Sequence, residues 1–128
     1  MTASSDETLR RRDRERHGRR AEAMAAWFLR LKGYRVVARR YRTPVGEIDL
    51  VVKRGRALVF VEVKARATEL AGALAVTPAA RARIARAGEA WLSRYPAAAR
   101  LDLRFDVVVI LPRRWPVHIR DAFGTGRS

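Results

Sequence analysis

The stretch GEIDLVVKRGRALVFVEVK, residues 46–64, decides the fold. Most of it is apolar and rich in valine, and a glycine interrupts it near the middle, so it predicts two β-strands joined by a tight turn. Three carboxylates and a lysine nevertheless lie inside it, namely Glu47, Asp49, Glu62 and Lys64. Charged side chains are rarely buried unless they are paired, so these four need an explanation.

The faces of the two strands follow from the alternation of side chains along a strand. The first strand is expected to present Glu47, Asp49 and Val51 on one face and Ile48, Leu50 and Val52 on the other. The second strand is expected to present Leu58, Phe60, Glu62 and Lys64 on one face and Val59, Val61 and Val63 on the other. The turn decides whether the two charged faces coincide.

The turn length sets the register of this hairpin. A two-residue loop of Gly55 and Arg56 would be a type II′ turn, which favours glycine first. Arg54 would then pair with Ala57, which predicts the pairs Asp49–Glu62 and Glu47–Lys64. A loop of Arg54 and Gly55 shifts the register by two residues and keeps the same faces together, whereas an odd-length loop without a bulge separates them. Both simple turns gather Asp49, Glu62 and Lys64 on one face.

Two opposed carboxylates repel each other in a half-buried site, so they either take up a proton or bind a cation. Mg²⁺ and Mn²⁺ accept oxygen ligands of this kind, and Lys64 on the same face can contact a phosphate. This set suits hydrolysis of a phosphodiester. The alternative is a set of ordinary cross-strand ion pairs on a solvated face. Leu58 and Phe60 on the charged face argue against simple solvation.

The charge balance favours a polyanionic partner. The chain has a formal net charge of +15, and self-repulsion of that size opposes compaction unless an anionic partner offsets it. Nucleic acid is the first interpretation, and an acidic membrane surface is the second. The absence of cysteine excludes disulfides and Cys-ligated metals. With no secretory leader and no apolar run of about 20 residues, we expect a cytoplasmic protein without a membrane span.

The rest of the chain predicts one α/β domain over residues 17–123 with a central mixed sheet. Residues 1–16 are expected to form a disordered basic tail and residues 124–128 a short disordered tail. A helix over 18–32 is expected to bury Ala21, Met24, Ala25, Phe28 and Leu31. Strands are expected over 34–40, 47–53, 57–64, 103–111 and 116–123, a loop over 65–76, and a helix over 77–95 that starts with Thr77 and Pro78.

The charged residues of the hairpin, together with other stretches of the chain, resemble the sequence of a known family. Asp49 and the Glu62-Val63-Lys64 run on the next strand resemble the PD-(D/E)xK nuclease superfamily. The closer resemblance is to the bacterial YraN-like family of predicted endonucleases, related to archaeal Holliday-junction resolvases. Stretches that carry it are GRRAE (18–22), GEIDLV (46–51), VFVEVKAR (59–66), RFDVV (104–108) and HIRDAF (118–123). Ile48 stands where the superfamily's name places a proline.

The resemblance implies a restriction-endonuclease-like core, a central mixed sheet flanked by helices. It implies that Asp49, Glu62 and Lys64 form the catalytic triad and that Glu22 adds an acid to the site. Asp49, Glu62 and Glu22 would then bind Mg²⁺ or Mn²⁺. Because resolvases cut two strands as symmetric dimers, it also allows a homodimer.

Other polar and aromatic residues receive expectations of their own. Glu47 is expected either to contact the residues of the triad without binding the metal itself or to form an ion pair with Lys64. Residues expected to hold phosphates are Arg66, Arg81, Arg83 and Arg86. For Asp106 we expect an ion pair with Arg104, and for His118 a structural role on an edge strand. The three tryptophans, Trp27, Trp91 and Trp115, are expected in the core or at an interface rather than as platforms for bases.

The sequence therefore predicts a metal-dependent endonuclease that acts on DNA, with branched or structured DNA as a candidate substrate. The alternative is a non-catalytic nucleic-acid-binding protein on the same fold. The first requires a divalent ion and the second does not.

Overall fold

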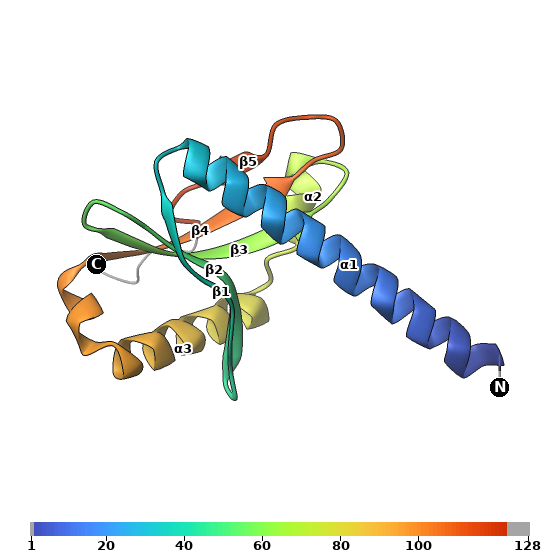
Figure 1. Ribbon diagram of the computed structural model, residues 1–128, viewed down its shortest axis with the longest axis horizontal. Helices are drawn as coiled ribbons and strands as arrows, with labels where there is room; N and C mark the ends of the chain where they lie inside the picture. Colours follow the sequence, from blue (N-terminus) through green and yellow to red (C-terminus); the bar gives the residue numbers. More distant parts are fainter. Residues whose placement is uncertain (1, 123–128) are drawn as a thin grey trace.

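The computed structural model describes the backbone of residues 2–122 and the side chains of 7–10, 12 and 18–122 (Figure 1). In chain order its elements are α1 (Thr2–Leu31), β1 (Arg35–Thr43), β2 (Gly46–Arg54), β3 (Ala57–Ala65), α2 (Glu69–Leu74), α3 (Pro78–Arg94), the 3-10 helix η1 (Pro96–Arg100), β4 (Asp102–Ile110) and β5 (Val117–Ile119). The expected tail over 124–128 lies outside the described residues.

The strands form one sheet in the order β1-β2-β3-β4-β5. Neighbours are antiparallel except β3 and β4, which are parallel. A parallel pair needs a long crossover, and here α2, α3 and η1 supply it. The predicted mixed sheet flanked by helices is therefore confirmed.

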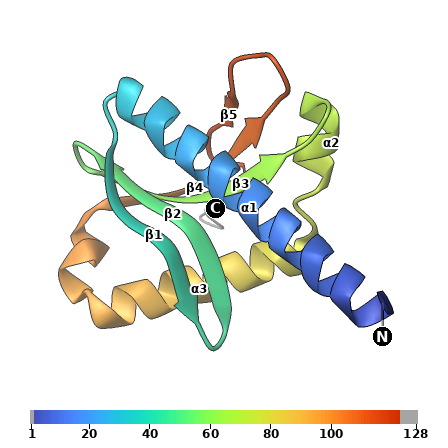
Figure 2. The same ribbon diagram turned by 45° about the vertical axis from the view of Figure 1, so that its right-hand side comes forward.

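Helices cover both faces of the sheet, with α1 on one side and α3 on the other (Figures 1 and 2). Against α1 the sheet packs Leu50, Val52, Val59, Val61, Val108 and Ile110. Against α3 it packs Ile48, Val51, Leu58 and Phe60. Burial on both faces explains why the strands read as nearly continuous apolar runs.

Helix α1 corrects two predictions. Residues 1–16 were expected to be disordered, but α1 begins at Thr2, and its N-terminal half projects away from the sheet (Figure 1). Absence of apolar periodicity is not absence of helix, because Arg, Glu and Ala are good helix formers that extend a helix already nucleated. The buried face also differs from the expected one: Ala26 and Leu29 are buried, whereas Met24 and Leu31 are 47% and 59% exposed.

Three further elements, α2, α3 and β5, can be compared with the predictions from the sequence. The expected loop over 65–76 contains α2, whose N-cap Thr68 accepts a hydrogen bond from the backbone N of Ala71. A helix of six residues is too short for a periodic pattern, so the sequence analysis missed it. Helix α3 begins as expected, with Thr77 as its cap and Pro78 in its first turn. Strand β5 ends at Ile119, before the predicted boundary, and residue 123 of that prediction lies outside the described part of the chain.

Candidate active site

The turn between β2 and β3 has the even register that the site requires. Arg54 pairs with Ala57, which leaves Gly55 and Arg56 as a two-residue loop. Gly55 has a φ of +59°, and Arg56 has no positive φ, as a type II′ turn demands. The predicted register is therefore confirmed from the turn as far as Leu50 and Val61, whereas the predicted strand pairs Asp49–Glu62 and Glu47–Lys64 are not formed.

Strands β2 and β3 are paired next to their turn and separate at their acidic residues, Asp49 and Glu62. Their pairing ends at Leu50 and Val61, while β3 stays paired with β4 as far as Ala65. Asp49 lies in the resulting fork, where its Oδ2 accepts a hydrogen bond of 2.8 Å from the backbone N of Val63. The carboxylate thus takes the place of a backbone acceptor that the departing strand no longer offers.

The fork also breaks the alternation of β2. Ile48 packs with Val51 against α3, although it was expected on the same face as Leu50, which packs against α1. Asp49, expected beside Val51, instead lines a hollow with Glu22 of α1. The expectation of strict alternation was therefore wrong at Asp49, because the strand turns at the point where it leaves β3.

Asp49, Glu62 and Lys64 meet at this fork. The pKa of Asp49 is raised to about 8, first by burial and then by the negative charge of Glu62 and a hydrogen bond between the two carboxyl groups. Lys64 Nζ lies 3.4 Å from Glu62 Oε1, and both side chains are largely buried. Near neutral pH the Asp49 carboxyl therefore holds a proton, which a cation can replace.

Glu22 lies at the same hollow but already has a partner. Arg40 Nε donates to both of its carboxylate oxygens, at 2.6 and 3.1 Å. Glu22 still contributes to raising the pKa of Asp49 through its charge. Among the described residues, however, no group of three or more His, Cys, Asp or Glu side chains is arranged to hold a metal ion. The structure brings Asp49 and Glu62 together as a pair and does not assemble the expected set of three acids.

Arg40 is a site residue that the sequence analysis missed. Its φ is +51°, a left-handed conformation that is uncommon for a non-glycine residue, and it lies where β1 borders the irregular part of β2. This conformation brings its guanidinium to Glu22, and that hydrogen bond is the main cause of the raised pKa of Arg40. No spacing in the sequence distinguishes Arg40 from its arginine neighbour at 39, so only the structure reveals it.

The remaining expected site residues are more scattered. Glu47 was expected opposite Lys64, but its nearest cation is Arg42 of β1, at 3.7 Å, because β2 has left β3 at this point. Arg66 is exposed and lines the hollow of about 350 Å³ that also contains Asp49 and Lys64. The exposed arginines of α3, on the other side of the sheet, do not line that hollow: Arg81, Arg83 and Arg86.

The donor set fits a hard divalent cation. Two close carboxylates gain most from a cation that removes their repulsion, and Mg²⁺ or Mn²⁺ bound by two carboxylates completes its shell with waters and phosphate oxygens. Lys64 lies beside the pair and can contact a phosphate that bridges to such an ion. The arrangement can therefore bind an ion and a phosphate group side by side.

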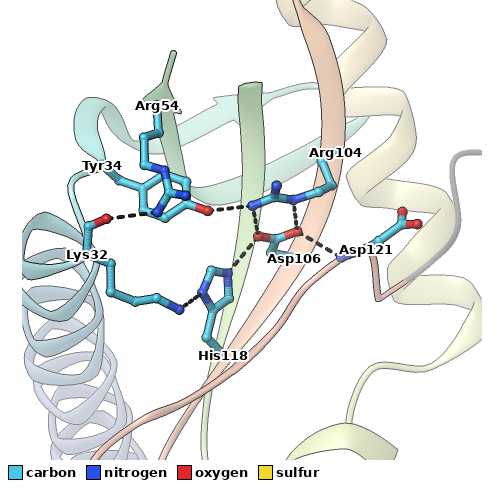
Figure 3. Close-up of polar contacts among 7 residues, drawn as sticks. All are labelled: Lys32, Tyr34, Arg54, Arg104, Asp106, His118 and Asp121. Carbon is cyan, nitrogen blue, oxygen red and sulfur yellow. Dashed lines mark hydrogen bonds and ion pairs between the residues drawn. The ribbon is translucent and has the colours of Figure 1, made fainter. Parts of the chain in front are cut away.

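A second polar cluster lies on the sheet near the C-terminal end of α1 (Figure 3). Asp106 is fully buried and accepts hydrogen bonds from Arg104, from His118 Nε2 at 2.7 Å and from the backbone N of Asp121 at 3.0 Å. Lys32 Nζ donates to His118 Nδ1 at 2.6 Å. The predicted Arg104–Asp106 ion pair is confirmed. His118 connects β5 to β4 through Asp106 and to Lys32, the residue that follows α1.

Burial alone would raise the pKa of Asp106, but the hydrogen bonds from His118, Arg104 and Asp121 outweigh it and lower the pKa to about 2. Asp106 thus remains ionised where Asp49 takes up a proton. Both carboxylate oxygens of Asp106 accept hydrogen bonds from within the protein, which indicates a structural anchor rather than a catalytic group.

The sequence pattern of the uncharacterised protein family UPF0102 matches residues 21–110. The chain belongs to this family. That region includes Glu22, Arg40 and the whole β2–β3 hairpin. The expected YraN-like relationship is confirmed at the level of the family.

Similar UPF0102 proteins come from several bacteria. A UPF0102 protein of Parvibaculum lavamentivorans is 62% identical over 108 residues, which are 84% of this chain and 81% of the relative. One of Brucella canis is 55% identical over 109 residues, 85% of this chain and 86% of the relative. One of Methylorubrum extorquens is 51% identical over 123 residues, 96% of each chain. Each of these similarities therefore extends over most of both chains.

No helix in the described part of the chain, residues 2–122, is both long and apolar enough to cross a membrane.

Proposed function

We propose that this UPF0102 protein is a metal-dependent endonuclease of the PD-(D/E)xK superfamily that hydrolyses phosphodiester bonds in DNA. The observation that carries the proposal is the fork, where burial and the charge of Glu62 raise the pKa of Asp49 to about 8, and where Lys64 lies 3.4 Å from Glu62. A pair of acids held close together costs stability, and such groups are typical of functional sites.

Each residue of the fork has a role in this proposal. Asp49 and Glu62 would hold Mg²⁺ or Mn²⁺, which supplies Lewis-acid polarisation of the phosphodiester when bound. Lys64 would contact a non-bridging phosphate oxygen and stabilise the negative charge that develops during attack. Arg40 would keep Glu22 in place beside Asp49, and Arg66 at the rim of the hollow would bind a neighbouring phosphate.

The charge of the chain supports a nucleic acid as the substrate. With a net charge of +15 and exposed arginines on α1 and α3, much of the affinity for DNA would come from phosphate contacts and would fall steeply with salt. Branched DNA remains the favoured form because of the resemblance to junction resolvases. A homodimer, which would place two forks on two strands, stays a prediction.

The test is cleavage of plasmid and four-way-junction DNA by the full chain with Mg²⁺ or Mn²⁺. We expect Asp49→Asn and Lys64→Ala each to lose at least about 100-fold in rate, by the usual size of electrostatic contributions to catalysis. Glu89→Gln, which removes an exposed carboxylate of α3, should cut like the wild type. Cleavage that survives both site variants would refute the assignment. Salt-dependent binding without any cleavage would support the non-catalytic alternative.

A further inference from the structure

Three adjoining hollows, together called the groove, lead away from the fork along α1. The hollow at Asp49 shares Ala65 and Arg66 with a second hollow of about 550 Å³. The second hollow shares Met24, Leu111 and Arg113 with a third of about 400 Å³, which is lined by residues of α1 and of the loop that joins β4 to β5. Because neighbouring hollows share lining residues, the three adjoin one another.

The far end of this groove is both aromatic and basic. Trp27 of α1 and Trp115 of the β4–β5 loop line it and are 58% and 68% exposed. Phe28 packs against Trp115, with their ring centroids 6.4 Å apart. Arg113 and Arg114 line the same hollow. By contrast, Trp91 is 6% exposed and belongs to the core against α3.

The exposed position of these two indoles needs a reason. Exposed patches of large apolar side chains on a folded protein commonly mark binding surfaces. Arg113 adopts a φ of +58°, a conformation that an L side chain rarely takes, at the rim of this hollow. Backbone strain of this kind persists where function requires the geometry.

We propose that the groove binds an unpaired stretch of nucleic acid that leads to the fork, with bases stacked on Trp27 and Trp115. This inference rests on the proposed function, because it places the strand on the path to Asp49. Interleaved arginines and aromatic rings are the usual surface for single strands, where the rings take the bases and the arginines take the phosphates.

The aromatic rings favour an unpaired strand over a duplex. In a duplex each base has its faces covered by its neighbours, so an indole reaches a base face only where pairing and stacking are interrupted. Arg66, Arg113 and Arg114 along the path argue against a second copy of this strongly basic chain as the occupant, because two such surfaces would repel each other. The groove therefore selects substrates with a single-stranded segment next to the cleaved bond.

The test is binding of a fluorescein-labelled oligothymidylate, measured by anisotropy with EDTA present, so that no cleavage is involved. We expect Trp27→Ala and Trp115→Ala each to weaken binding about 5- to 100-fold, the range for loss of one stacked base. Trp27→Phe and Trp115→Phe should retain most of the affinity. The matched control is Tyr95→Ala, which removes an aromatic ring of similar exposure, 43%, from the end of α3.

The readouts separate this inference from the proposed function. Asp49→Asn should bind the oligonucleotide yet cut nothing, whereas Trp27→Ala should lose binding to single strands while its affinity for a blunt duplex stays within about twofold. The inference is overturned if both tryptophan variants bind like Tyr95→Ala, or if they lose duplex binding equally. It is also overturned if their weaker binding accompanies loss of a dimer in sedimentation, because the groove would then be a self-association surface. Melting curves that match the wild type exclude unfolding.

Discussion

Replacement of Asp49 by asparagine should stabilise the protein at pH 8. Asparagine has the shape of a protonated aspartate, and its Oδ1 can still accept the hydrogen bond from Val63. It carries no charge, so neither burial nor Glu62 opposes it. The substitution therefore removes the cost of the acid pair and keeps the geometry of the fork.

The size of the effect follows from the pKa of Asp49. The folded protein raises this pKa from 3.8 to about 8, so between these values the folded state holds a proton that the unfolded chain has lost. The free energy of unfolding must then fall as pH rises through this window, by at most about 1.4 kcal/mol per unit. The upper limit is about 5 kcal/mol. Because solvent reaches Asp49 and weakens the electrostatic contributions, we expect a gain of about 1–3 kcal/mol for Asp49→Asn at pH 8.

The assay is urea denaturation of wild type and variant from pH 4 to pH 8. The two stabilities should agree near pH 4 and diverge as pH rises, and Asp102→Asn, at an exposed aspartate, should follow the wild type throughout. Adding Mn²⁺ at pH 8 should stabilise the wild type and leave Asp49→Asn unchanged. A variant that is no more stable than the wild type at pH 8 would refute the reasoning.

Three further substitutions test other contacts. Arg40→Met leaves the Glu22 carboxylate buried without its guanidinium partner and should cost about 3–5 kcal/mol in urea denaturation, against less than about 0.5 kcal/mol for the exposed Arg39→Met. Gly46→Ala should cost about 1–3 kcal/mol, because a Cβ at this position would collide with the Arg83 carbonyl of α3, whereas Gly18→Ala has open space and should be neutral or stabilising. Asp106→Asn should lower the free energy of unfolding by about 2–4 kcal/mol near pH 6. Because the pKa of Asp106 is lowered to about 2 in the folded state, this difference in stability from the wild type should shrink as pH falls from about 4 to 2.

The β2–β3 hairpin shows which structural features can be predicted from the sequence and which cannot. Alternation and the glycine in the turn predicted its register, because these follow from local backbone chemistry. They did not predict that the pairing of β2 with β3 stops at Leu50 and Val61, since beyond Val61 the only neighbour of β3 among the described strands is β4, which lies far away in the sequence. The fork, and with it the position of Asp49 against α1, depends on those distant contacts.

Arg40 and the groove show the same limit. The positive φ of Arg40 and the exposure of Trp27 are set by packing, and no residue spacing reports either of them. Helix α1 buries its small alanines and exposes Met24 and Trp27, the reverse of what apolar size alone predicts, because alanine allows the helix to lie close to the sheet. The charge pattern and the acid–lysine motif, in contrast, could be read directly from the sequence.

Calorimetric titration of Mn²⁺ into the full chain tests most directly whether the fork is a metal site. At pH 7 we predict one ion bound per chain, with release of close to one proton, detected as a difference in heat between two buffers. Asp49→Asn and Glu62→Gln should each weaken binding at least about tenfold, and the exposed Glu89→Gln should bind like the wild type. Absence of Mn²⁺ binding by the wild type, or binding that both site variants leave unchanged, would contradict the account.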